Sequence, residues 1–226
     1  MKVFAVIPAF NEAPRIQETV RGVLRFVRQV IVVDDGSSDE TAERAKEAGA
    51  LVCRHAVNRG QGAALKTGTI AALIHGADTV VHVDADGQHD PDCLPSLIEP
   101  IERDQADVVF GSRFLGVPSE GMPPFRRVLL KAAKGFSRYA LGIPYQITDP
   151  QSGLRAMSAE AAEEIDFTQD RMAHCSEILR LVTRSDLRWK EVPTRIRYTE
   201  DSLAKGQKPA DAFAIVWQLF LGIFQR

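Results

Sequence analysis

Acidic side chains follow three apolar segments of the sequence, and their spacing suits metal-dependent phosphate chemistry. The clearest set is Asp84, Asp86 and Gln88, which come directly after the apolar run 79–83. Residues two apart in an extended segment point to the same side, so the carboxylates of Asp84 and Asp86 would repel each other without a neutralising cation. Carboxylate and amide oxygens suit Mg2+ or Mn2+, which leave positions for phosphate oxygens. We therefore expect Asp84, Asp86 and Gln88 to hold such a metal against a nucleoside diphosphate.

Two further acidic segments occupy corresponding places in the sequence. Glu12 follows closely on the apolar run 3–7, and Asp34 and Asp35 follow the run 30–33. Open α/β sheets bind ligands beyond the carboxyl ends of their strands. Any one of these motifs could be an ordinary polar loop after a strand. Three acidic strand ends in order favour a shared ligand site.

The elements that must position these residues follow from the alternation of two sequence patterns. Short apolar runs are typical of buried strands, and apolar residues three and four apart are typical of helices. The expected strands are 3–7, 30–33, 50–53, 79–83 and 107–110. The expected helices between them are 16–27, a capping-box helix that begins at Ser37-x-x-Glu40, 61–75 and 92–103. This alternation predicts a single α/β domain with a Rossmann-like, mainly parallel sheet flanked by helices.

The pattern changes after Gly111, where helical segments become longer. We expect helices at 126–141, 158–165 and 174–184 and a strand pair near 188–198. The composition shifts again at Thr199. We therefore divide the chain into a catalytic or binding domain, 1–198, and a terminal segment, 199–226.

Composition excludes several classes of protein. The 226 residues are 45% hydrophobic and 26% charged, as expected of a globular protein. The formal charge of -2 provides no general basic field, so we expect no nucleic-acid partner. The three cysteines, Cys53, Cys93 and Cys175, are far apart and suggest neither a disulfide framework nor a zinc site. The apolar run at the start is too short for a signal peptide or a membrane span, so we expect a cytoplasmic protein.

Five segments together resemble glycosyltransferase family 2, and most of all the dolichol- and polyprenyl-phosphate sugar transferases. These segments are PAFNE at 8–12, VDDGSSDET at 33–41, NRGQG at 58–62, DADGQHDP at 84–91 and GSRF at 111–114. The resemblance runs in order from residue 3 to about 157, where it ends in DPQSGLRA at 149–156, and it continues more weakly to 207. It implies a GT-A fold, a nucleoside-diphosphate sugar as donor, a divalent metal, and inverting transfer onto a lipid-linked phosphate.

The resemblance also implies roles for individual residues. The nucleotide base and ribose would be held by a group at the strand ends: Pro8, Phe10, Glu12, Val33, Asp35, Asp84 and Ala85. Asp86 and Gln88 would hold the metal, and Arg113 matches the arginine that the family places near the diphosphate and the acceptor. On the acceptor side we expect Arg127, Arg197 and Lys205 to reach phosphates. Two departures affect that side, since Lys131 replaces the family's usual serine and extra residues separate Ser202 from Lys205.

The acceptor decides which residues are catalytic. Negative charge that grows on the leaving diphosphate would be offset by the metal on Asp86 and by Arg113. A phosphate monoester has a second pKa of about 6 and is already a dianion at neutral pH, so it needs no base. A hydroxyl acceptor would need a carboxylate base, for which Asp149 is the candidate, although Asp149 could instead only cap a turn. A polyprenyl phosphate acceptor, a saccharide or other hydroxyl acceptor, and a noncatalytic nucleotide-sugar-binding protein are therefore three alternatives.

Two sequence features point to a membrane surface. Arg127, Lys131, Lys134 and Arg138 would form one basic stripe on a helix. The apolar stretch 212–224 is too short to cross a hydrocarbon core of ~30 Å at ~1.5 Å per residue. It would either lie in the membrane interface or dock on the domain. We expect a peripheral protein on the inner face of the membrane, with a membrane-anchoring partner as the alternative means of attachment.

Overall fold

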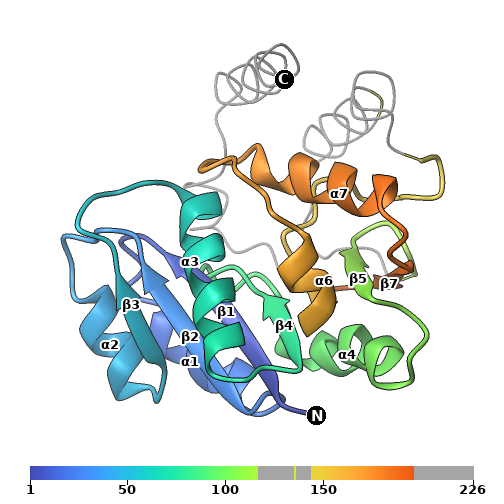
Figure 1. Cartoon of the computed structure of the whole chain (residues 1–226). Coiled ribbons are helices and arrows are strands. Elements are labelled where there is room, and N and C mark those ends of the chain that lie inside the picture. The colour runs from blue at the N-terminus through green and yellow to red at the C-terminus, as the bar shows by residue number, and fades with distance from the viewer. Residues whose placement is uncertain (117–134, 136–143, 196–226) are drawn as a thin grey trace.

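The computed structural model describes residues 1–116, 135 and 144–195, and these form one seven-stranded sheet with helices on both faces (Figure 1). The strand order is β3-β2-β1-β4-β6-β5-β7. The strands are β1 (Val3–Ala9), β2 (Gln29–Asp34), β3 (Leu51–Arg54), β4 (Thr79–His82), β5 (Val108–Ser112), β6 (Arg155–Ser158) and β7 (Trp189–Pro193). β6 runs antiparallel to its neighbours β4 and β5, and every other pairing is parallel. The expected mainly parallel α/β sheet is confirmed.

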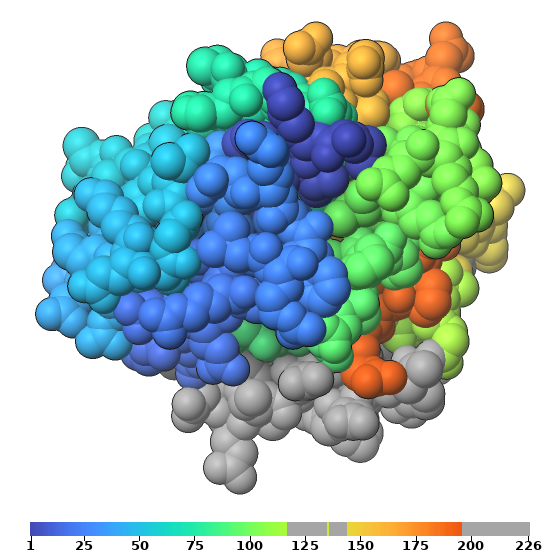
Figure 2. Space-filling model, turned by 90° about the horizontal axis from the view of Figure 1, so that it is seen from below, coloured from blue at the N-terminus to red at the C-terminus, as the bar shows by residue number. Residues whose placement is uncertain are grey.

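The helices form two layers. They are α1 (Ile16–Leu24), α2 (Thr41–Glu47), α3 (Gln61–Ile74), α4 (Leu94–Glu102), α6 (Ala159–Glu164) and α7 (His174–Arg184), with a short 3-10 turn η1 (Pro91–Cys93) before α4. Apolar residues of α3, α6 and α7 share one buried cluster with one face of the sheet, and those of α1, α2 and α4 share another with the opposite face. Figure 2 shows the N-terminal part and the later segments meeting in one continuous surface, as expected of a single domain.

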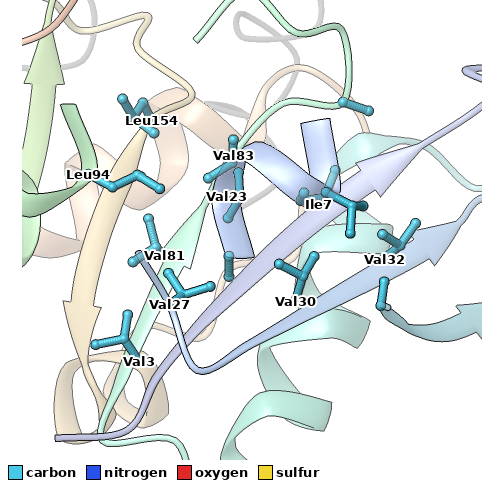
Figure 3. Packing of buried hydrophobic residues seen from close by; sticks show 14 of the residues in the cluster. Val3, Ile7, Val23, Val27, Val30, Val32, Val81, Val83, Leu94 and Leu154 are labelled. Carbon is cyan, nitrogen blue, oxygen red and sulfur yellow. The ribbon is translucent and has the colours of Figure 1, made fainter. Parts of the chain in front are cut away.

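Alternation along the strands explains why both faces are covered. Val3, Ala5 and Ile7 of β1 enter the cluster with α1, while Phe4 and Val6 enter the cluster with α3. Each fully buried valine, isoleucine or phenylalanine side chain contributes roughly 1.5–3 kcal/mol to the stability of the fold. Figure 3 shows part of the cluster that α1, α2 and α4 share with the sheet. The labelled residues are Val3, Ile7, Val23, Val27, Val30, Val32, Val81, Val83, Leu94 and Leu154.

Two sequence-based expectations differ from the structure, and a third is tested only in part. Strand β6 was not predicted, because Arg155-Ala-Met-Ser158 is short and contains a charged residue. Of the strand pair expected at 188–198, one strand is present as β7, which pairs in parallel with β5, and residues 196–198 lie outside the described ranges. The expected capping box is wrong: Ser37 accepts a hydrogen bond from the backbone N–H of Asn11, and α2 begins at Thr41 with no side-chain cap.

Several expectations fall on residues outside the described ranges. These are the helix at 126–141, Arg127, Arg197, Lys205 and the terminal segment 199–226. Among the described residues, every helix is too short or too polar to cross a lipid bilayer.

Close packing of α3 on the sheet yields a test of the fold. A Cβ added at Gly68 would lie 2.2 Å from Cγ1 of Val6 and 3.0 Å from Cγ2 of Val33. We expect Gly68→Ala to lower the free energy of unfolding by about 1–3 kcal/mol, because overpacking outweighs the gain in helix propensity. Urea denaturation measures this. Ile74→Ala, on the exposed side of the same helix, should change stability by less than about 0.5 kcal/mol, and equal effects would contradict the packing.

Candidate active site

The three acidic segments meet at one edge of the sheet. β2, β1 and β4 are adjacent and parallel, so their carboxyl ends lie side by side. The backbone N–H of Asp35 donates to the carbonyl of Ala9 over 2.8 Å, and the N–H of Ser38 donates to the side-chain oxygen of Asn11 over 3.0 Å. The sheet therefore brings the segments after residues 9, 34 and 82 together, as the sequence predicts.

The Asp35 carboxylate is fixed by three groups of the segment 55–60. It accepts hydrogen bonds from the backbone N–H groups of Arg59 at 3.0 Å and Gly60 at 2.7 Å, and its Oδ1 lies 2.6 Å from Nδ1 of His55. The other ring nitrogen of His55 lies 2.9 Å from the hydroxyl of Thr67. His55 was not predicted as a site residue, because its contact depends on how β3 pairs with β2. The buried Asp35 thus presents a rigid oriented carboxylate.

The Asp84 carboxylate is held equally firmly. Its Oδ1 accepts from Nε2 of Gln61 at 2.7 Å, and its Oδ2 lies 3.0 Å from Nε2 of His89. Gly153 packs directly against it, since an added Cβ would lie 2.8 Å from Oδ2. Burial alone would raise the pKa of Asp84, but the hydrogen bond from His89 and the positive charges of His89 and Arg155 lower it to about 2. Asp84 is therefore a permanent negative charge at neutral pH.

Asp86 shares this region with two other carboxylates. Its Oδ1 accepts the backbone N–H of Gln88 at 3.0 Å, which forms a tight turn. Burial and the negative charges of Asp84 and Glu12 raise the pKa of Asp86. Negative charge is thus in excess at this edge, and a cation there would relieve the repulsion.

A divalent metal fits this donor set. Within the described ranges, no three His, Cys, Asp or Glu side chains form a group that could hold a metal by themselves. Mg2+ and Mn2+ sites often use only one or two carboxylates and take their remaining ligands from water and substrate phosphates. Asp86 and Gln88 would be the direct protein ligands, and Asp84, whose oxygens accept hydrogen bonds from Gln61 and His89, would add negative charge beside them.

The remaining residues expected at the base and ribose are of two kinds. Pro8 and Val33 pair across β1 and β2 and are buried, as is Ala85, so only their backbone groups can face a ligand. The ring of Phe10 is 47% exposed. Glu12 is partly buried, and its Oε2 lies 3.3 Å from Nη1 of Arg15.

Arg113 and Asp149 bind each other. Nε and Nη2 of Arg113 each lie 2.6 Å from an oxygen of Asp149, and the Arg113 backbone N–H donates to Oδ2 at 3.1 Å. Both side chains are buried. Glu191 of β7 then fixes the loop, because its carboxylate accepts from the backbone N–H groups of Thr148 and Asp149. Glu191 was not predicted, since its sequence context is that of an ordinary strand residue.

The loop 149–153 connects the two halves of the site. It begins at Asp149 against Arg113, ends at Gly153 against Asp84, and leads into β6 between β4 and β5. The antiparallel direction of β6 makes this possible, because β6 starts at the edge where β4 and β5 end. The segment DPQSG at 149–153 therefore contacts Arg113 at its first residue and Asp84 at its last.

The buried pair yields a prediction about stability. Asp149→Asn breaks the ion pair that both oxygens of Asp149 form with the Arg113 guanidinium, so we expect the free energy of unfolding to fall by about 3–5 kcal/mol. Chemical denaturation followed by circular dichroism measures the change. Glu99→Gln removes an exposed ion pair with Arg103 and should cost less than about 1 kcal/mol. Similar small losses for both variants would show that the buried pair does not stabilise the loop.

Comparison with known proteins agrees with this geometry. The family model described as "Glycosyl transferase family 2" matches residues 4–166. The chain is 33% identical to the UDP-N-acetylglucosamine–dolichyl-phosphate N-acetylglucosaminyltransferase of Methanococcus voltae, over 97% of this chain and 95% of that protein. It is 32% identical to the polyprenol monophosphomannose synthase of Mycolicibacterium smegmatis, over 84% of this chain and 72% of that protein.

A solved structure shares the fold. Glucosyl-3-phosphoglycerate synthase from Mycobacterium tuberculosis, in complex with Mn2+, uridine diphosphate and glucosyl-3-phosphoglycerate, superposes with a TM-score of 0.76 at 21% identity. The match covers 97% of this chain and 77% of that chain. The sheet therefore has the GT-A arrangement, and with the family match over most of its length the chain belongs to glycosyltransferase family 2.

Proposed function

We propose that this chain transfers a sugar from a nucleoside diphosphate to a polyprenyl phosphate, with inversion and with Mg2+ or Mn2+, at the cytoplasmic face of a membrane. The convergence of Asp84, Asp86 and Glu12 at one sheet edge carries this proposal, because that charge suits a metal-bound diphosphate. The names of the two relatives support the lipid phosphate as acceptor. They name different sugars, so the donor sugar is a matter for experiment.

Different residues of the site would contact different parts of the donor. Asp35 is fixed by the backbone of Arg59 and Gly60 and would accept a hydrogen bond from the nucleotide. Asp86 and Gln88 would hold the metal. When bound, the metal supplies positive charge against the leaving diphosphate. The partly exposed Phe10 would shield the nucleotide from water.

The state of Asp149 favours a phosphate acceptor over a hydroxyl. Both of its oxygens accept hydrogen bonds from the Arg113 guanidinium and are therefore occupied by that side chain. A hydroxyl acceptor needs a base, whereas a phosphate monoester attacks as the anion it already is. A hydroxyl acceptor is the second candidate, because the solved structure with the same fold is a complex with glucosyl-3-phosphoglycerate.

The deciding assay combines donors and acceptors. Purified chain is incubated with Mn2+ and UDP-N-acetylglucosamine, UDP-glucose or GDP-mannose, in vesicles that contain a short polyprenyl phosphate. We expect one donor to yield a sugar-lipid phosphate. Transfer to phosphoglycerate alone would favour the second candidate, and donor binding without any transfer would indicate a noncatalytic binding protein. Cosedimentation with the same vesicles tests the membrane contact, whose expected residues lie outside the described ranges.

Assignment of Asp86 as a metal ligand predicts that replacing its carboxylate by an amide lowers the transfer rate strongly. We expect Asp86→Asn to lower the transfer rate by about 100-fold or more, because several kcal/mol of charge stabilisation would be lost. The matched control is Asp92→Asn, since Asp92 lies shortly after this segment, is exposed, and forms an ion pair with the exposed Arg25 at 3.4 Å. Its rate should stay within twofold of the unaltered chain. Full activity of Asp86→Asn at limiting Mn2+ would defeat the assignment.

A further inference from the structure

A buried charged cluster lies next to the loop 149–153 and contacts it through the carbonyl of Gly153. It consists of Arg155 on β6 and of His174 and Cys175 at the start of α7, which are 1%, 0% and 7% exposed. Arg155 pairs in register with His82 of β4 and Phe110 of β5, in the middle of the sheet. An arginine at such a position requires a compensating partner, because burial of an unpaired charge is costly.

The hydrogen bonds of Arg155 identify that partner. Its Nε donates to the carbonyl of Gly153 at 3.2 Å, and its Nη2 lies 3.4 Å from the sulfur of Cys175. A carbonyl carries no net charge. Of these two hydrogen-bonded partners, only Cys175 can therefore become an anion.

The neighbouring histidine provides a second donor to the same sulfur. Nδ1 of His174 lies 2.7 Å from the carbonyl of Arg171, which only accepts, so Nδ1 carries a hydrogen. Nε2 of His174 lies 3.3 Å from the Cys175 sulfur. The proton shared by this pair can reside on sulfur or on Nε2. The guanidinium of Arg155 donates to the sulfur and stabilises it as an anion, and its repulsion of a charged His174 is smaller than the attraction between His174 and that anion.

The other ionisable groups near this cluster do not replace Cys175. On β4, Nε2 of His82 lies 2.9 Å from the hydroxyl of Thr69, whose own hydrogen goes to the carbonyl of Leu65. Burial and the charge of Arg155 hold the pKa of His82 well below its ordinary value, so His82 is neutral. Asp84, beyond the end of β4, is negative and interacts electrostatically with Arg155, but its oxygens accept hydrogen bonds from Gln61 and His89, whereas Cys175 is the ionisable group that Arg155 contacts by a hydrogen bond.

Electrostatics at the cysteine agree with the geometry. Burial would raise the pKa of Cys175, but the positive charges of His174 and Arg155 lower it to about 6. Burial would lower the pKa of His174, yet the charge on Cys175 and the hydrogen bond to it raise it. Opposite shifts in the two partners are the signature of an ion pair.

We propose that Cys175 is a thiolate in the folded protein, that it forms a buried ion triad with His174 and Arg155, and that this triad positions Gly153 against Asp84. The connection runs through Nε of Arg155, which fixes the Gly153 carbonyl, while Gly153 leaves no room for a Cβ beside Asp84. Cys175 and Arg155 are thus positioning residues. Their effect on transfer rests on the proposed function, whereas the thiolate itself does not.

The charge state is tested by absorbance. Cys53→Ser with Cys93→Ser leaves Cys175 as the only cysteine of the chain. We expect the ultraviolet absorbance of a thiolate to be present at pH 7 and to disappear with a midpoint near pH 6. Adding Arg155→Gln should raise the midpoint by about one unit or more, and Arg155→Lys is the substitute should that variant not fold. A midpoint at the ordinary value of about 8.5 in the folded protein would overturn the triad.

The positioning role is tested by a double-mutant cycle. Cys175→Ser removes the charge, because a serine hydroxyl stays neutral, and Gly153→Ala displaces Asp84 directly. We expect each to weaken Mn2+-dependent nucleotide binding several-fold, measured by calorimetry with whichever of UDP and GDP the unaltered chain binds, and the two effects to be clearly non-additive. Arg184→Lys on the exposed end of α7 is the control and should bind the same nucleotide normally. Additive effects, or unchanged binding by Cys175→Ser, would reject the positioning role.

Failure of the proposed function would look different. In that case the unaltered chain would bind neither UDP nor GDP with Mn2+, or would bind one of them without transferring a sugar, while the absorbance titration of Cys175 would still report the thiolate. The two experiments therefore separate an error about the reaction from an error about the triad.

Discussion

Strands β2, β1 and β4 run side by side in one direction, so the acidic segments that follow them must share one edge of the sheet, where their negative charges repel. Among the described residues, the fold does not relieve this repulsion by burying a lysine between them. It holds Asp84 with hydrogen bonds from Gln61 and His89 and leaves the pKa of Asp86 raised by its neighbours. This excess of negative charge is the basis of the proposed metal site.

The antiparallel strand β6 links this edge to the rest of the site. Because β6 begins where β4 and β5 end, the loop before it can contact Arg113 at one end and Asp84 at the other. Glu191 fixes the first contact, and Arg155 fixes the second through the Gly153 carbonyl. The positions of the charged groups thus depend on one short loop whose two ends are anchored in the sheet.

The sequence was sufficient for features that depend on local pattern. Apolar runs located the five strands before residue 116 to within about two residues, and the motifs after them located the acidic edge. Features that depend on tertiary pairing were missed. His55 and Glu191 act only because β3 and β7 lie where they do, and β6 lacks an apolar run because Arg155 occupies its first position. The predicted capping box is absent because the Ser37 hydroxyl accepts a hydrogen bond from the backbone N–H of Asn11 instead. That contact joins residues far apart in the sequence, so no local pattern reveals it.

The most direct test of the metal site is anomalous diffraction from crystals of the whole chain grown with Mn2+ and UDP. We expect an anomalous peak bonded to the Asp86 carboxylate, with the diphosphate completing its coordination and Asp84 still held by Gln61 and His89. A manganese ion bound at another place, with UDP absent from the edge formed by β2, β1 and β4, would contradict this site.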